Sequence, residues 1–223
     1  MLTVIGSLKG GTGKSTVTFN LALWVLLNRR SVLVVDLDPQ ATLTDVVRVR
    51  REEGYLPEVA LMNTLDQALQ VAADYDEVII DIGPSDPATM YAAILAAQQV
   101  LVPVPPSQAD VWSTQRFVRK VRELRGERDQ PQLVGFINRA DTHTAVRESD
   151  EAFGALGMIE GLRVLRPRLR QRMMFRRSLS EGLSVQELER RGKAAQELDE
   201  LAHAFFRTRN HRYNGDSNLQ KQG

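Results

Sequence analysis

Three glycines, two lysines and three hydroxyl side chains follow one another near the start of the chain. They join an apolar run, Leu2–Gly6, to a segment of helical periodicity that begins at Ser15. In such a turn the backbone N–H groups wrap around phosphate oxygens, and the helix N-terminus adds partial positive charge. Lys14 would reach the terminal phosphates, and the Ser15 hydroxyl would bind Mg²⁺. The pattern predicts a phosphate site made of Lys9, Gly10, Gly11, Thr12, Gly13, Lys14, Ser15 and Thr16.

This turn departs at one position from the strict phosphate-loop pattern G-x-x-x-x-G-K-[ST], because Leu8 stands where the first glycine belongs. The shorter core Gly-Gly-x-Gly-Lys-Ser is still rare. With glycine at ~7% of residues, fewer than about one chain of this length in a thousand contains that core by chance. The alternative is a glycine-rich turn between a strand and a helix that binds no ligand.

Carboxylates lie at the ends of two further apolar runs. Asp36 ends the run Val32–Asp36 and is followed closely by Asp38, while Asp81 lies in the run Glu77–Ile82. A carboxylate just past a strand end can hold the hydration shell of Mg²⁺, and a second one can orient an attacking water. Asp38 has an alternative interpretation, since an aspartate at such a place also caps helices and closes Asx turns.

The elements that would position these residues alternate along the chain. Short runs of Val, Ile and Leu without polar alternation are typical of strands buried on both faces. Their alternation with helical segments predicts an α/β fold, a doubly wound and mostly parallel sheet with ligands beyond the strands' carboxyl ends. The expected strands are Leu2–Gly6, Val32–Asp36, Glu77–Ile82, Val100–Pro105 and Leu133–Asn138. The expected helices are Ser15–Asn28, Leu65–Ala73, Pro87–Ala97, Trp112–Arg125, Ala145–Leu156 and the amphipathic Ala194–Phe206.

Composition sets further bounds. The 223 residues, 43% apolar and 26% charged, are expected to form one domain over residues 1–206 and a polar, disordered tail over 207–223. The absence of cysteine excludes disulfides, cysteine-ligated metals and thiol nucleophiles, and three scattered histidines do not suggest a metal cluster. No apolar run approaches the ~20 residues that span a bilayer. A cytoplasmic protein is therefore expected.

An arginine-rich segment contrasts with the formal net charge of +1. Such a concentration attracts phosphate backbones without reading base sequence, with an affinity that falls steeply with salt. It predicts a DNA-binding surface, and a solvated helix face with salt bridges across a dimer is the alternative. The arginines are Arg163, Arg166, Arg168, Arg170, Arg172, Arg176 and Arg177.

The segment Lys9–Thr16 resembles the deviant Walker A motif of the ParA/MinD superfamily, whose hallmark is an additional lysine before the glycines, here Lys9. The resemblance covers residues 1 to about 206. It implies ATP and Mg²⁺ as ligands, and a homodimer formed with ATP. In that dimer Lys9 would reach the phosphates of the partner's ATP, a role like that of an arginine finger supplied in trans. Without the resemblance, a solvated loop lysine is an equal interpretation.

The same resemblance assigns roles at the strand ends. The segment D-L-D-P-Q is similar to switch I of the family, in which Asp36 would support Mg²⁺ and Asp38 would orient the water. Asp81 matches the Walker B aspartate, and the Gly-Pro turn after it differs at one position from the family's usual switch II. Asn138 falls where the family holds adenine, although an asparagine satisfied by backbone groups is the alternative.

The region Leu169–Glu187 resembles the C-terminal part of small ParA proteins, which bind nonspecific DNA as ATP dimers. The resemblance implies an ATPase that positions a plasmid, a chromosome or a microcompartment such as the carboxysome on the nucleoid. A small activating adaptor, similar to ParB or McdB, would be its partner. Membrane attachment of the MinD kind is not expected, because the tail is polar. The alternative is a metabolic P-loop enzyme, such as an amidoligase or kinase, which leaves the arginines unexplained.

Overall fold

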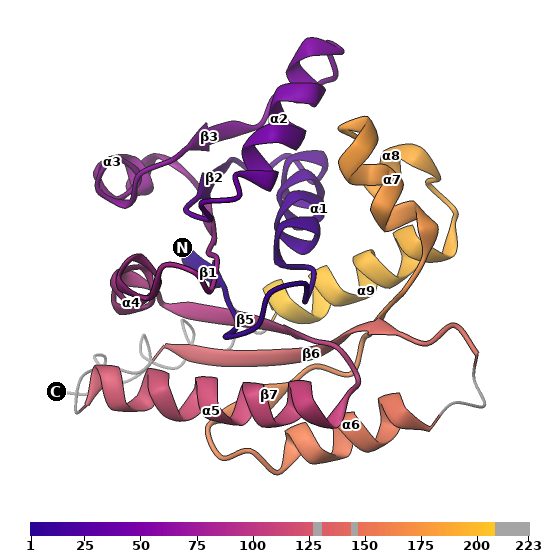
Figure 1. Ribbon diagram of the computed structural model, residues 1–223. Coiled ribbons are helices and arrows are strands. Elements are labelled where there is room, and N and C mark those ends of the chain that lie inside the picture. The colour runs from indigo at the N-terminus through magenta and orange to yellow at the C-terminus, as the bar shows by residue number, and fades with distance from the viewer. Residues whose placement is uncertain (127–130, 144–146, 208–223) are drawn as a thin grey trace, which may run out of the picture.

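The computed structural model describes residues 1–126, 131–143 and 147–207. Its strands form a parallel sheet in the order β3-β2-β4-β1-β5-β6-β7, with β8 also paired to β6 (Figure 1). The predicted α/β class with a parallel sheet is confirmed. The strands are β1 (Leu2–Ile5), β2 (Val32–Asp36), β3 (Ala60–Met62), β4 (Glu77–Asp81), β5 (Gln99–Val104), β6 (Gln132–Ala140), β7 (Leu162–Val164) and β8 (Leu169–Arg170).

Helices cover both faces of this sheet, and each face has its own apolar cluster (Figure 1). One cluster joins α1 and α2 to α9, and the other joins α3, α4, α5 and α6 to the opposite face. The helices are α1 (Lys14–Leu27), α2 (Thr42–Glu52), α3 (Leu65–Val71), α4 (Pro87–Ala96), α5 (Gln108–Arg125), α6 (Glu148–Gly157), α7 (Met173–Glu181), α8 (Val185–Leu188) and α9 (Lys193–Arg207), with a 3₁₀ turn at Ala72–Asp74.

The first helix is buried over most of its length, so its apolar side chains do not follow one stripe. Its outer side is covered by α9, the amphipathic helix that the sequence predicts near Ala194–Phe206. The Trp24 ring stacks on Phe206 at 5.4 Å between centroids, and its indole N–H donates to the Asp199 carboxylate at 2.8 Å. This packing of the chain's two ends favours the proposal of one domain over residues 1–206.

The predicted element boundaries are right to within a few residues, with informative exceptions. The helix expected from Trp112 begins at Gln108, because Ser107 accepts a hydrogen bond from the Asp110 N–H and caps it. The helix expected from Ala145 begins at Glu148, and residues 144–146 lie outside the described part of the chain. The elements α2, β3, β7, β8, α7 and α8 had no counterpart in the sequence patterns.

The expected tail falls almost wholly outside the described part of the chain. Arg207 is the last residue of α9, and residues 208–223 lie beyond the described residues. None of the helices in the described residues combines the length and apolar character needed to cross a membrane.

The parallel register brings the predicted motifs to one edge of the sheet. Ile5, the last residue of β1, lies beside Asp81, and Asp81 lies beside Asp36. The glycine-rich turn leaves β1 at this edge, and Asn138 lies toward the carboxyl end of β6. Residues far apart in the sequence are thereby gathered around the start of α1.

Candidate nucleotide site

The glycine-rich turn folds as a cradle between β1 and α1. Gly11 and Gly13 have positive φ angles of 74° and 89°, in the left-handed region that glycine adopts without strain. A Cβ on Gly13 would lie 2.6 Å from the Asn138 amide nitrogen, so only glycine fits there. The Ser7 hydroxyl donates to the Lys9 carbonyl at 2.9 Å and lies 3.1 Å from the Thr12 hydroxyl. These bonds fix the turn before any ligand arrives.

Lys14 is buried at the first position of α1, beneath the turn. Its ammonium donates to the Lys9 carbonyl at 3.2 Å. Burial lowers the pKa of Lys14, while the nearby carboxylates of Asp81 and Asp38 raise it. The side chain therefore lies between the turn and the strand-end carboxylates, where its positive charge partly compensates that of the aspartates.

Asp81, at the end of β4, is fully buried. Within the described residues no hydrogen bond of regular geometry reaches either carboxylate oxygen, although the neighbouring Ser15 hydroxyl lowers its pKa. Burial dominates and raises the pKa of Asp81 to about 7, with a further rise from Asp36 and an opposing effect of Lys14. A buried carboxylate without partners is costly unless a cation neutralises it.

These features are the ones that a hard cation needs. Mg²⁺ takes oxygen ligands and usually combines one or two carboxylates with water and phosphate oxygens. The orphaned oxygens of Asp81 and the hydroxyl of Ser15 lie together beside the phosphate turn. The donor set therefore fits Mg²⁺ bound together with a nucleotide.

Asp36 is buried at the neighbouring strand end, but its oxygens are occupied. One oxygen accepts from both the N–H and the hydroxyl of Thr44 at 2.8 Å, and the other accepts from the Asp38 N–H at 3.2 Å. Asp36 thus ties the first turn of α2 to the sheet. The predicted contact with Mg²⁺ stays a prediction, and the structure adds this second task.

Asp38 is half-buried and lies against the turn that follows Asp81. An ideal Cβ on Gly83 would lie 2.6 Å from the Asp38 carboxylate, so glycine leaves the space that this side chain fills. One carboxylate oxygen also accepts from the Gln40 N–H at 3.0 Å, which is the Asx turn of the alternative interpretation. The Asx turn of the alternative is present, and the orientation of an attacking water by Asp38 stays a prediction. The contact with Gly83 joins the two predicted switch segments.

Lys9, the additional lysine, reaches away from the cradle. Its ammonium forms an ion pair of 2.6 Å with Asp110 in the first turn of α5, and its side chain is 42% exposed. Asp110 is in turn held by the Ser107 hydroxyl. Asp110 was not among the predicted site residues, because only the fold brings β5 and α5 beside the phosphate turn.

A cavity of about 200 Å³ opens on the other side of the turn, lined by the start of α1, the end of β6, β8 and α7. Asn138 lines this cavity, and its amide nitrogen donates to the Thr12 carbonyl at 2.7 Å. The side-chain amide is therefore partly satisfied by backbone, as the alternative for Asn138 holds. Contact with adenine stays a prediction. We call this space the base-side cavity.

The arginine-rich segment does not form one continuous patch. Arg170 and Arg172 both bind the buried carboxylate of Glu197, at 2.7 and 2.6 Å, and both line the base-side cavity. Arg168 pairs with Asp150, and Arg177 pairs with Glu181 within α7. Four of the seven arginines thus form ion pairs within the chain, whereas the alternative from the sequence is salt bridges across a dimer. Arg166 and Arg176 are exposed.

Arg139 is a further neighbour of the turn that the sequence patterns did not indicate. It has a φ of 57° at the carboxyl end of β6, and its guanidinium donates to the Gly11 carbonyl at 2.6 Å. An arginine in the left-handed region is uncommon and tends to mark functional positions. No sequence signal distinguishes it from an ordinary exposed arginine.

Comparisons with known proteins agree with this geometry. The chain is 27% identical over 205 residues to "Maintenance of carboxysome distribution protein A" of Halothiobacillus neapolitanus, covering 88% of this chain and 92% of that protein. It is 28% identical over 177 residues to the chromosome-partitioning ATPase Soj of Thermus thermophilus, covering 65% and 71%. The ATP complex of a Cyanothece McdA variant shares the fold, with a TM-score of 0.74, 22% identity and coverage of 92% and 96%.

A family model agrees with these relatives. The model of the CobQ/CobB/MinD/ParA nucleotide binding domain matches residues 3–185, most of the chain and all of the cradle and strand-end carboxylates described above. The resemblance to the ParA/MinD superfamily is confirmed. The chain belongs to the CobQ/CobB/MinD/ParA family of nucleotide-binding proteins.

Proposed function

We propose that this protein is an Mg²⁺-dependent ATPase that dimerises on ATP, binds nonspecific DNA and positions a cargo through partner-stimulated hydrolysis. The observation that carries the proposal is the pair of lysines at one turn. Lys14 lies buried at the start of α1, whereas Lys9 of the same turn is 42% exposed and pairs with Asp110 of α5. A lysine that serves only its own nucleotide has no need to point away from the cradle.

The residues of the cradle divide the work of phosphate transfer. Backbone N–H groups of Gly10–Ser15 and the Lys14 ammonium bind the phosphates, and Asn138 lies on the base side. Bound Mg²⁺ would neutralise charge on the terminal phosphates, held by Ser15 and Asp81 with support from Asp36. Asp38 orients the attacking water and accepts its proton, and its contact with Gly83 sets where its carboxylate lies.

Lys9 completes the site of a second copy. On dimerisation its ammonium exchanges Asp110 for the phosphates of the partner's ATP, where negative charge develops during transfer. Because the exchange replaces one negatively charged partner by another, Lys9 keeps a counter-charge in both states. ADP lacks the terminal phosphate and offers a weaker counter-charge. ATP therefore favours the dimer.

Sedimentation of the hydrolysis-blocked Asp38→Ala variant with Mg²⁺ and either ATP or ADP tests this step. We expect a dimer with ATP and a monomer with ADP. Adding Lys9→Ala should return the ATP sample to monomer while ATP still binds. The matched control is Lys120→Ala, an exposed lysine on α5. A monomer in saturating ATP, or a dimer that tolerates Lys9→Ala, would refute the proposal.

DNA binding is supported by exposed basic residues rather than by the whole arginine-rich segment. Arg166 lies between β7 and β8, Arg176 lies on α7, and α5 presents Arg116, Arg119 and Arg122 to solvent. One protomer offers few phosphate contacts, and two protomers double them, so affinity would rise with ATP and fall with salt. This coupling would place the ATP form on the nucleoid in the cytoplasm, where a small adaptor similar to ParB or McdB releases it.

The cargo is inferred from the relatives alone. One of them is named for carboxysome distribution and another for chromosome partitioning. We therefore assign a positioned cargo of one of these two classes.

Binding to a duplex of arbitrary sequence across a salt series tests the DNA proposal. Arg166→Ala with Arg119→Ala should weaken binding of the ATP form and lower the salt slope by roughly 2 per protomer, about 1 for each phosphate that an arginine no longer neutralises. The control changes Arg51 and Arg190, which are exposed elsewhere. ATP-independent binding, or equal effects of both pairs, would contradict a nucleotide-gated DNA surface.

A further inference from the structure

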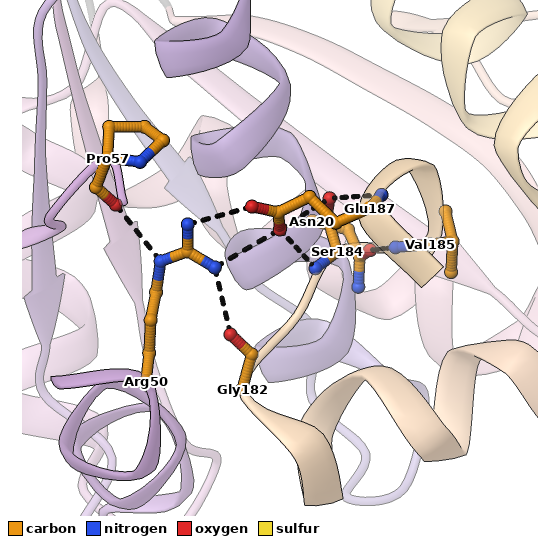
Figure 2. A network of polar contacts seen from close by, with 7 residues as sticks. All are labelled: Asn20, Arg50, Pro57, Gly182, Ser184, Val185 and Glu187. Carbon is orange, nitrogen blue, oxygen red and sulfur yellow. Dashed lines mark hydrogen bonds and ion pairs between the residues drawn. The ribbon is translucent and has the colours of Figure 1, made fainter. Parts of the chain in front are cut away.

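Arg50, near the end of α2, is a charged side chain that is only 1% exposed (Figure 2). Its guanidinium makes a two-pronged ion pair with Glu187, at 2.8 and 3.1 Å, which is the strongest geometry for such a pair. It also donates to the Pro57 carbonyl at 3.0 Å and to the Gly182 carbonyl at 2.9 Å. A buried arginine with this many partners is held in a single orientation.

Glu187 belongs to the capping box of α8. The ion pair with Arg50 therefore connects α2 to the first turn of α8. The Ser184 N–H and hydroxyl both donate to the Glu187 carboxylate, at 2.8 and 2.9 Å (Figure 2). Asn20 on α1 accepts from the Val185 N–H at 2.9 Å and donates to the Ser178 hydroxyl at 2.8 Å. The helices that start at the phosphate turn and after Asp38 are thus both bonded to the α7–α8 region.

Helix α7 forms one wall of the base-side cavity, and polar contacts hold the chain at both ends of this helix. Phe175, Arg176 and Leu179 of α7 line the cavity. Just before α7 begins, Arg172 binds Glu197 of α9. Where α7 ends, the Gly182 carbonyl accepts from Arg50, and a Cβ on Gly182 would lie 2.8 Å from the Arg50 backbone nitrogen. The end of α7 therefore rests directly on α2.

The opposite end of α2 belongs to the phosphate side of the site. Thr44 in its first turn donates twice to Asp36. A helix transmits a shift at one end to the other because its backbone ladder is stiff. One rigid element therefore connects the strand-end carboxylates with the cavity wall.

We propose that Arg50 is a positioning residue for nucleotide binding, which holds the α7 wall of the base-side cavity against α2. Arg50 does not touch the nucleotide and acts only through α7 and α8. The proposal rests on the nucleotide site proposed above. Its signature is selective: a loosened wall weakens binding of the base end of ATP and leaves the phosphate cradle intact.

Binding of Mg²⁺·ATP and of Mg²⁺·tripolyphosphate, which has no base, separates the two ends of the site. Arg50→Lys keeps the charge but loses the planar fork that pairs with Glu187 and Gly182. We expect the Kd for ATP to rise about tenfold, a size typical of remote coupling positions. The Kd for tripolyphosphate should stay within about twofold, as should both constants for the control Arg48→Lys, an exposed arginine on α2.

A second variant keeps the test decisive if Arg50→Lys fails to fold. Arg50→Met with Glu187→Gln removes both charges together, a replacement that buried pairs often tolerate, and the amide oxygen of the new side chain still accepts from the Ser184 N–H. It should fold and still show the selective loss for ATP, because the bond to Gly182 is gone. Equal losses for ATP and tripolyphosphate, or no loss in either variant, would overturn the positioning role. A wild-type protein that binds neither ligand would instead refute the nucleotide site itself.

Discussion

Asp36 and Asp81 are neighbours on adjacent parallel strands, facing each other in register at the same edge of the sheet, yet they differ in their surroundings. Asp36 receives three hydrogen bonds from Thr44 and Asp38. Asp81 receives none of regular geometry within the described residues, and its pKa is raised to about 7 by burial. The first carboxylate is held by hydrogen bonds within the protein, and the second is the one that we propose to hold a cation.

Two aspartates of the same kind and position can therefore differ in how their removal changes the free energy of unfolding. A partnered carboxylate contributes to folding, since its loss strands buried donors. An unpartnered buried carboxylate opposes folding until a ligand compensates it. Removing the Asp36 carboxylate is therefore expected to lower stability. Removing the Asp81 charge is expected to raise the stability of the nucleotide-free protein and to lower its ATP hydrolysis.

The largest effect is expected for Asp81→Asn. Losing the anionic oxygens beside Ser15 should lower Mg²⁺-dependent hydrolysis roughly a thousandfold, since metal-assisted charge stabilisation supplies several kcal/mol. The nucleotide-free variant should nevertheless be more stable than the wild type at pH 8, by on the order of 2 kcal/mol or roughly 4–8 °C in Tm. Calorimetry and phosphate release measure the two changes. A less stable apo variant would show that Asp81 has partners after all.

Gly83→Ala tests the role of a third carboxylate near this edge of the sheet, that of Asp38. The new methyl group would lie 2.6 Å from the Asp38 carboxylate, which must move, whereas the backbone can stay in place. We expect hydrolysis to fall about a hundredfold, as for a catalytic group displaced by about 1 Å, with ATP affinity and Tm nearly unchanged. Gly154→Ala on α6, where the added methyl meets nothing, is the control. If Gly83→Ala hydrolysed ATP at the wild-type rate, Asp38 would have no part in the hydrolysis step.

Asp36→Ala should act mainly on folding. The substitution leaves the Thr44 N–H at the start of α2 without its acceptor, which lowers the free energy of unfolding by about 1–3 kcal/mol. Thr44→Val keeps the backbone donor and loses the hydroxyl's bond to Asp36 and its exposed bond from the Asn63 amide, so a smaller loss is expected. Urea denaturation compares the two. If Asp36→Ala were as stable as wild type, the contrast with Asp81 would disappear.

The smallest effect is a pH dependence that separates the two kinds of carboxylate. The folded pKa of Asp81 lies above its ordinary 3.8, so its contribution to stability is present below about pH 4 and is lost as pH rises toward about 7. Burial raises the pKa of Glu197, but hydrogen bonds from Arg172 and Arg170 outweigh it and leave the pKa below the ordinary 4.5. Its contribution is present above 4.5 and is lost as pH falls.

Thermal unfolding of the nucleotide-free protein from about pH 3 to pH 8 tests both signs. Asp81→Asn should flatten the decline toward neutral pH, and Glu197→Gln should flatten the decline toward acid. The same slope in wild type and in either variant would mean that the carboxylate concerned is not a titrating group in this range.

The phosphate cradle and the strand-end aspartates could be predicted because their signals are local. A glycine-rich turn, a following helix and an apolar run that ends in aspartate are each visible within a few residues. The start of α5 could also have been found, since Ser107 and Asp110 have the spacing of a helix cap.

Other parts of the site carry no local signal. Arg50 occupies a core-facing position of α2, so the apolar period of that helix is broken by a charge. The pairing of Lys9 with Asp110, and of Arg170 with Glu197, depends on which segments the sheet order brings together. In the sequence these arginines look the same whether they are bound to Glu197 or exposed like Arg166.

The stacking of Trp24 on Phe206 has a consequence for synthesis in the cell. At about 5–20 residues per second, α9 is made roughly ten to forty seconds after α1. During that interval the nascent chain carries an uncovered apolar flank of α1. A ribosome that stalls before α9 would therefore release an aggregation-prone fragment, even though such a fragment contains the whole phosphate cradle.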